Sequence, residues 1–162
     1  MTQIASLCRS FSLLAVEETI RAIEQIFAIL DSTYQIIAED SAAQKPLMRV
    51  LMTLFDEGKL NPVPWWMMAQ EKDWMKQAIA EATRLGLLKP DFPSAAIADM
   101  LMRIYLANLR DYLFDKTSLD AFRDSATFEF WFCLSNIAAD GARADYAARA
   151  SRAAASLTRG AA

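Results

Sequence analysis

Two long stretches of the chain, 93–114 and 119–139, are apolar around most of a helical circumference. On a wheel of about 100° per residue, three charged side chains of the first stretch, Asp99, Arg103 and Arg110, fall on one narrow stripe. The second stretch has a similarly thin polar line. A single neighbour in a small monomer cannot cover such helices. The pattern therefore predicts a core on one side of each helix and a second copy of the protein on the other.

The rest of the chain also has helical periodicity. Residues 16–40 divide into an apolar and a polar face, as expected of a long amphipathic helix. A second helix is predicted to begin at Pro46 and to be closed by Gly58, and a third to span 65–85. These helices, together with the two apolar stretches, predict an all-α bundle.

Three segments follow from this pattern. Residues 1–15 are predicted to form a short helix or a frayed segment, and residues 16–140 the main domain. Residues 141–162 are rich in Ala and Arg, which favours a helical or disordered tail with little apolar surface to bury.

Composition supports an all-α protein and limits its partners. The 162 residues include only four glycines and five prolines, whereas residues that favour helices are plentiful. A net charge of −3 without a basic cluster speaks against direct contact with nucleic acid. Two isolated cysteines, Cys8 and Cys133, favour reduced thiols, and no apolar run is long enough for a membrane span or a signal peptide. We therefore expect a cytoplasmic protein without membrane contact.

Catalytic chemistry has little support in the sequence. The chain contains no histidine, which is the commonest general base and the commonest zinc ligand in proteins. Phosphate-binding, nucleophile-elbow and CxxC motifs are also absent. Paired carboxylates such as Glu17–Glu18 fall on predicted solvent faces. We expect no enzyme, no metal and no cofactor.

Three features carry candidate binding chemistry. The cluster 65–68 (WWMM), with Trp74 and Met75, suits either an adaptable apolar pocket or an ordinary core. Asn108 lies opposite the charged stripe of its helix, so its amide needs a partner across a helix interface or a ligand. Glu129 lies among aromatic residues, where a carboxylate needs a structural or interface partner or serves as a polar anchor for a ligand.

The order of elements resembles a known family. Residues 84–93 read RLGLLKPDFP, with Gly86, Leu88, Asp91 and Pro93 in a connector, and the helix that follows opens SAAIADMLMRIYLANLRDYLF. This arrangement resembles the carboxy-terminal regulatory half of tetracycline-repressor (TetR) family transcription regulators, over residues 16–140.

The resemblance implies a TetR C-terminal-domain-like helical bundle that dimerises through its last two long helices and encloses an apolar small-molecule cavity. It implies a small-molecule-responsive regulatory domain of a transcription regulator. The family's helix-turn-helix domain has no counterpart in residues 1–16, so this chain itself is not expected to contact DNA. It is then either a regulatory domain separated from its DNA reader or a stand-alone relative.

The resemblance implies candidate residues for a ligand cavity and for a dimer interface. We expect the ligand cavity to be lined by Ile23, Phe27, Tyr34, Trp66, Met67, Trp74 and Met100. We expect the dimer interface to contain Tyr105, Asn108, Leu109, Tyr112, Glu129, Phe130 and Cys133. Two alternatives stay open: a protein-interaction module whose apolar helices bind a different protein, and a carrier of lipid or another hydrophobic ligand.

Overall fold

The chain folds into helices throughout the part that the structure describes. The computed structural model describes residues 2–57 and 63–160, with side-chain surroundings for residues 21–54, 57 and 71–158. Within this part the helices are α1 (Thr2–Glu39), α2 (Ser41–Asp56), α3 (Val63–Arg84), α4 (Ser94–Leu113), α5 (Leu119–Ile137) and α6 (Asp140–Gly160). The predicted all-α fold is confirmed.

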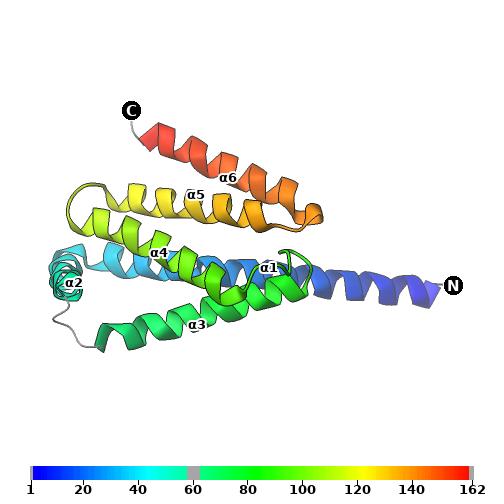
Figure 1. The fold of residues 1–162 in the computed structure, drawn as a ribbon. Coiled ribbons are helices and arrows are strands. Elements are labelled where there is room, and N and C mark those ends of the chain that lie inside the picture. Colours follow the sequence, from blue (N-terminus) through cyan, green and yellow to red (C-terminus); the bar gives the residue numbers. More distant parts are fainter. Residues whose placement is uncertain (1, 58–62, 161–162) are drawn as a thin grey trace.

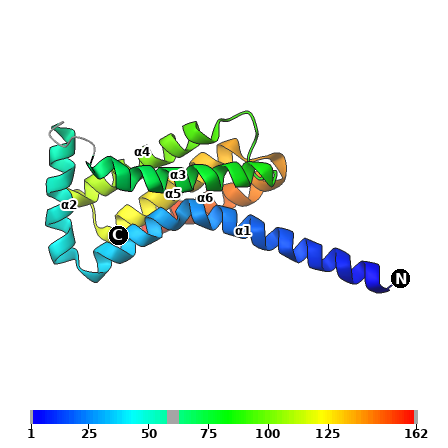
Figure 2. The same cartoon turned by 90° about the horizontal axis from the view of Figure 1, so that it is seen from below.

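Four helices form the body of the molecule. α1 packs against α3 and α5, and α4 also packs against α3 and α5, so the four close into a bundle (Figure 1). α2 crosses one end of this bundle and contacts α1 and α4 (Figure 2). α6 packs along the outer side of α5, and the N-terminal part of α1 extends past the ends of the other helices (Figure 1).

The core lies where the apolar faces of these helices meet. Ile26 and Leu30 of α1, Ile79 of α3, and Phe122 and Phe130 of α5 are all almost completely buried. Burial of one such side chain contributes about 1.5–3 kcal/mol relative to an exposed position. Ile26 and Leu30 lie on the apolar face that helical spacing predicts for α1, and this face turns inward.

Two helix starts differ from the sequence-based expectation. α1 begins at Thr2, so the expected boundary near residue 16 is not a break in the helix. α2 begins at Ser41, because Asp40 caps it by accepting a hydrogen bond from the amide of Ala43 (3.2 Å). Pro46 consequently lies inside α2, where its ring nitrogen donates no helical hydrogen bond.

The Ala/Arg-rich segment forms a complete helix, α6, and packs along α5. Tyr146 and Ala150 are buried there, and the ring centroid of Tyr146 lies 5.4 Å from that of Trp131. Alanine has almost no side chain, so the two helices approach closely. This segment adds a layer to the bundle rather than a loose tail.

The connectors fix how α4 and α5 lie. Gly86 ends the α3 turn with φ +73°, the left-handed conformation expected of a terminating glycine. After it, the amide of Lys89 donates to the carbonyl of Ile137 (2.9 Å), and the amide of Ala139 donates to the carbonyl of Leu87 (2.9 Å). These two bonds attach the α3–α4 connector to the end of α5.

The α4–α5 loop is held from the side of α2. Asp115 has φ +62°, and its carboxylate accepts hydrogen bonds from Lys45 and Arg49 of α2 at 2.6 Å each. The Arg49 side chain also donates to the carbonyl of Leu113 (2.7 Å). Both ends of the α4–α5 pair are therefore anchored by other elements.

Candidate ligand groove between α4 and α5

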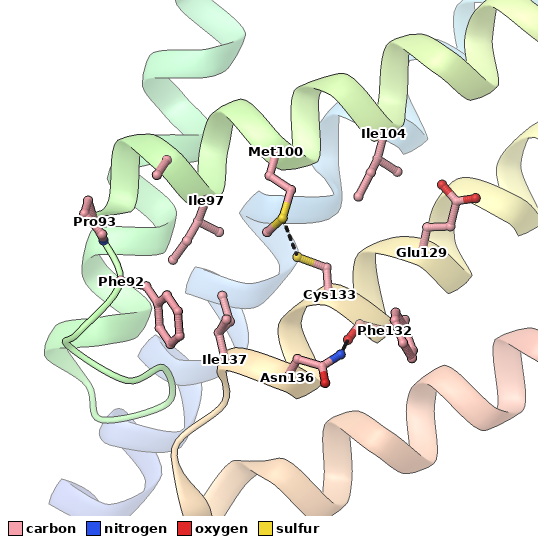
Figure 3. Close-up of a pocket in the computed structure, with 11 residues that line it drawn as sticks. Phe92, Pro93, Ile97, Met100, Ile104, Glu129, Phe132, Cys133, Asn136 and Ile137 are labelled. Atoms are coloured by element: carbon pink, nitrogen blue, oxygen red, sulfur yellow. Dashed lines mark hydrogen bonds between the residues drawn. The ribbon is translucent and has the colours of Figure 1, made fainter.

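A groove of about 560 Å³ runs between α4 and α5 on the outside of the bundle (Figure 3). Its residues come from the facing sides of the two helices and from the connector before α4, and they include buried side chains such as Ile97 and Ile137 as well as exposed ones. They are Phe92, Pro93, Ala96, Ile97, Met100, Ile104, Glu129, Phe132, Cys133, Asn136 and Ile137. We call this feature the α4–α5 groove.

The groove follows from helical spacing. Ala96, Met100 and Ile104 recur every four residues on α4, and Glu129, Cys133 and Ile137 do so on α5. Residues four apart lie on one face of a helix, so the two rows face each other along the pair. The anchored connector closes one end with Phe92 and Pro93 (Figure 3).

The walls of the α4–α5 groove are mostly apolar, and part of their surface is open to solvent. The exposed fractions of Phe92, Met100 and Phe132 are 42%, 40% and 57%. The thiol of Cys133 lies 3.8 Å from the thioether of Met100 (Figure 3). Burial raises the pKa of the Cys133 thiol to about 11, so the thiol is neutral near pH 7 and a weak nucleophile. The wall therefore favours binding over covalent chemistry.

The polar groups of the groove are few. Glu129 is half-buried, and its Oε2 accepts a hydrogen bond from the side-chain amide of Asn108 (2.9 Å). The same amide nitrogen donates to the carbonyl of Ile104 (3.0 Å). Asn136 donates from its amide to the carbonyl of Phe132 (2.7 Å). Among the described residues, no lysine or arginine forms an ion pair with Glu129, the single charged residue of the lining.

The residues expected to line an apolar cavity have different surroundings in the described chain. Met100 lines the α4–α5 groove, whereas Ile23 is buried in the core. The Trp74 side chain is 60% exposed on α3. Trp66 and Met67 lie outside the residues whose side chains the structure describes.

Two aromatic residues in the same expectation have other contacts. The Phe27 ring stacks on Trp131 of α5 with centroids 4.5 Å apart, so it joins α1 to α5. The Tyr34 hydroxyl donates to a carboxylate oxygen of Asp120 (2.8 Å), near the surface. Both side chains join α1 to α5. The sequence of α1 predicts that they lie on its apolar face, but it does not show whether they contact another helix or line a cavity.

Four residues expected at a dimer interface are buried within the single chain and do not line the groove: Tyr105, Leu109, Tyr112 and Phe130. The hydroxyl groups of Tyr105 and Thr33 share a hydrogen bond of 2.8 Å inside the bundle. The exposed fraction of Phe130 is 0%. Side chains covered by their own helices cannot contact a second copy, so these four assignments do not agree with the structure. Pairing through α4 and α5 as such stays a prediction.

The other three expected interface residues lie at the groove, where Cys133 is buried as well. Glu129 and Cys133 line it, and Asn108 lies beside it through its bond to Glu129. Phe92, Ile104 and Phe132 were not expected at a site, and Asn136 was placed only on the same helical side as Glu129. The sequence shows which residues of α4 and α5 share a helical face. It does not show which face turns inward, because both helices are apolar on several sides.

The described residues show neither a metal-binding cluster nor a membrane-spanning helix. No group of three or more Cys, Asp or Glu side chains there could hold a metal ion. The same part of the chain has no helix long and apolar enough to cross a membrane. The α4–α5 groove offers a concave, mostly apolar surface of the kind that binds small molecules.

Comparison with known proteins found no family model, no curated protein and no solved structure that matches this chain.

Proposed function

We propose that the chain is a small-molecule-binding regulatory domain of TetR type, whose apolar ligand lies in the α4–α5 groove. The observation that carries this proposal is the groove itself. Ligand sites in proteins are typically concave, about 300–1,000 Å³ in volume, and lined by apolar side chains with a few polar groups. The α4–α5 groove, at about 560 Å³, has this size and this lining.

The position of the groove suits a regulatory role. A ligand there touches α4, α5 and the connector before α4 at the same time. It would stabilise the arrangement of these elements that it fits best and shift the population toward that arrangement. The proposal needs no catalytic residue, in line with the sequence-based expectation of a non-enzymatic protein.

A second candidate function is pairing of two copies through the same face. Three large apolar side chains at the groove, Phe92, Met100 and Phe132, are each at least 40% exposed. A two-fold dimer presents the same patch from both copies, so one apolar face can cover the other. In this reading α4 and α5 form the interface, as the resemblance implies, but through their outward side chains.

Ligand binding can be tested with N-phenyl-1-naphthylamine, a neutral apolar dye whose fluorescence rises in apolar surroundings. Titration of the wild-type protein should give saturable binding. Met100→Arg places a charge in the groove wall, and we expect the affinity to fall about tenfold, because a charged group next to an apolar ligand must be desolvated. Trp74→Arg is the matched control, since it makes the same kind of change on α3 outside the groove.

The outcomes separate the candidates. Equal loss of dye binding in both variants, or no saturable binding to wild type, would count against a ligand in the groove. Native mass spectrometry of wild type and Phe132→Arg tests pairing independently. A wild-type mass of two chains that becomes one chain in the variant supports pairing through this face, and a dimer that persists in the variant places the interface elsewhere.

A further inference from the structure

We propose that the α4–α5 groove selects molecules that combine an apolar body with a cationic end, and that Glu129 binds this cation. This inference rests on the proposed ligand-binding function and names the class of ligand. An alkyl or aryl ammonium compound is the simplest member of that class.

The first argument is the unpaired charge of Glu129. Its carboxylate lies half-buried in an otherwise apolar wall, and within the described chain no cation forms an ion pair with it. A carboxylate can accept about four hydrogen bonds, but Glu129 accepts one, from Asn108. Partial removal of a charge from water is unfavourable unless it is paired. An ammonium group at Glu129 would supply the missing partner.

The second argument is the way in which Asn108 orients this carboxylate. The Asn108 amide nitrogen has two N–H donors, and it has two acceptors, the carbonyl of Ile104 and Oε2 of Glu129. The bond to Ile104 fixes the amide on α4, and the amide then holds one oxygen of Glu129 on α5. The other oxygen has no hydrogen-bond partner among the described residues and is available to a ligand.

The third argument is the one-sided distribution of charge. Glu129 lies at one end of the groove beside Ile104, and Phe92 and Pro93 lie at the other end (Figure 3). Met100 and Cys133 line the length between these ends. On α4 the lining spans from Ala96 to Ile104, about 12 Å at the helical rise of about 1.5 Å per residue. A ligand of this length would place its cation at Glu129 and its apolar body toward the connector.

The apolar part of the groove also suits such a ligand. Aromatic faces attract cations as well as apolar groups, and Phe132 lies one turn from Glu129 on α5. Methionine adapts to ligands of different shape, and Met100 lines the middle of the groove. A negatively charged ligand would meet only the carboxylate of Glu129 and should be excluded.

The inference can be tested with two probes of nearly equal shape, 4-phenylbutylammonium and 4-phenylbutanol. Isothermal titration calorimetry of the wild-type protein near pH 7 should show about tenfold tighter binding of the cation, because charge-assisted hydrogen bonds are about twice as strong as neutral ones. In Glu129→Gln the ratio of the two affinities should fall to about one. Glutamine keeps an oxygen acceptor for Asn108, so this variant preserves the local hydrogen bond.

Glu24→Gln provides the matched control, because it removes the same charge from an exposed position on α1. This variant should keep the wild-type preference for the cation. As a local readout, the side-chain amide signals of Asn108 in a nitrogen-15 NMR spectrum should shift with the cation in the wild-type protein and less with the alcohol.

Each result has a distinct meaning. Equal binding of both probes to the wild-type protein would overturn the cation preference and leave the ligand-binding proposal standing. A cation preference that survives in Glu129→Gln, or disappears in Glu24→Gln, would overturn the role of Glu129. Absence of binding by both probes would contradict the inference and, together with absence of dye binding, the proposed function.

Discussion

Phe130 and Phe132 lie two residues apart on α5 and should respond very differently to substitution by alanine. The Phe130 side chain is 0% exposed, and its ring centroid lies 5.6 Å from that of Phe27 on α1. Removal of a fully buried Phe side chain lowers the free energy of unfolding by about 3–5 kcal/mol, because it loses buried apolar surface and leaves a cavity. We expect this loss in Phe130→Ala.

Phe132 faces the α4–α5 groove, where its side chain is 57% exposed. Less than half of the ring is covered, so Phe132→Ala in the single chain should lower the free energy of unfolding by only about 1 kcal/mol, in proportion to the covered part of a Phe side chain. The same substitution thus compares an inward and an outward position of one helix, with the same change in residue type.

Urea unfolding followed by circular dichroism measures both effects. The midpoint should fall much further for Phe130→Ala than for Phe132→Ala, with similar dependence of the free energy on urea. Equal losses, or a larger loss for Phe132→Ala at low protein concentration, would refute the assignment of inward and outward faces. If two copies pair through the groove, the Phe132→Ala loss should instead grow as protein concentration rises, because dimerisation stabilises the folded state by mass action.

Further predictions concern two glycines and one tyrosine. Gly86→Ala should lower the free energy of unfolding by about 1–2 kcal/mol, because φ is +73° and a side chain is strained there although no atom lies within 4 Å of the added carbon. Gly141→Ala in α6 should instead raise the free energy of unfolding by about 0.5 kcal/mol, because alanine favours helix and the added carbon meets nothing within 4 Å. Urea unfolding of both variants measures the two changes in the free energy of unfolding. Changes of the same sign would contradict the backbone argument. The hydroxyl of Tyr146 is buried without a hydrogen-bond partner in the described structure, so Tyr146→Phe should raise the free energy of unfolding by about 1 kcal/mol at pH 7. Burial also raises the pKa of Tyr146 from 10.0 to about 12, so the unfolded chain releases this proton first and the wild-type protein loses stability as pH rises from about 10 to about 12. Tyr146→Phe should lose less over that window in thermal unfolding at a series of pH values, and an unchanged alkaline loss would exclude Tyr146 as its source.

The helical content of this protein could be predicted from local patterns. Helix formation depends on residues within a few positions of one another, so periodicity, few glycines and the terminator Gly86 were sufficient to predict helices close to α3, α4 and α5. The inward face of α1 was also predictable, since its polar and apolar residues separate cleanly. Caps were less predictable: Pro46 suggested a helix start, but Asp40 caps α2 five residues earlier in the chain than expected.

The candidate site depended on information that is not local. α4 and α5 are apolar on several sides, so their sequences allow more than one inward face, and the choice follows from which neighbours α1, α3 and α6 supply. Inside the bundle, the hydroxyl of Tyr105 shares a hydrogen bond with that of Thr33 on α1, and the ring of Phe130 lies against that of Phe27. The remaining apolar side chains that face each other across α4 and α5, such as Met100 and Phe132, line the groove. Sequence alone thus determined that this is a helical protein with more apolar helix surface than one neighbour can cover, because these properties are local. Which part of that surface is core and which is groove follows from the packing of the helices, because burial depends on contacts between residues far apart in the chain.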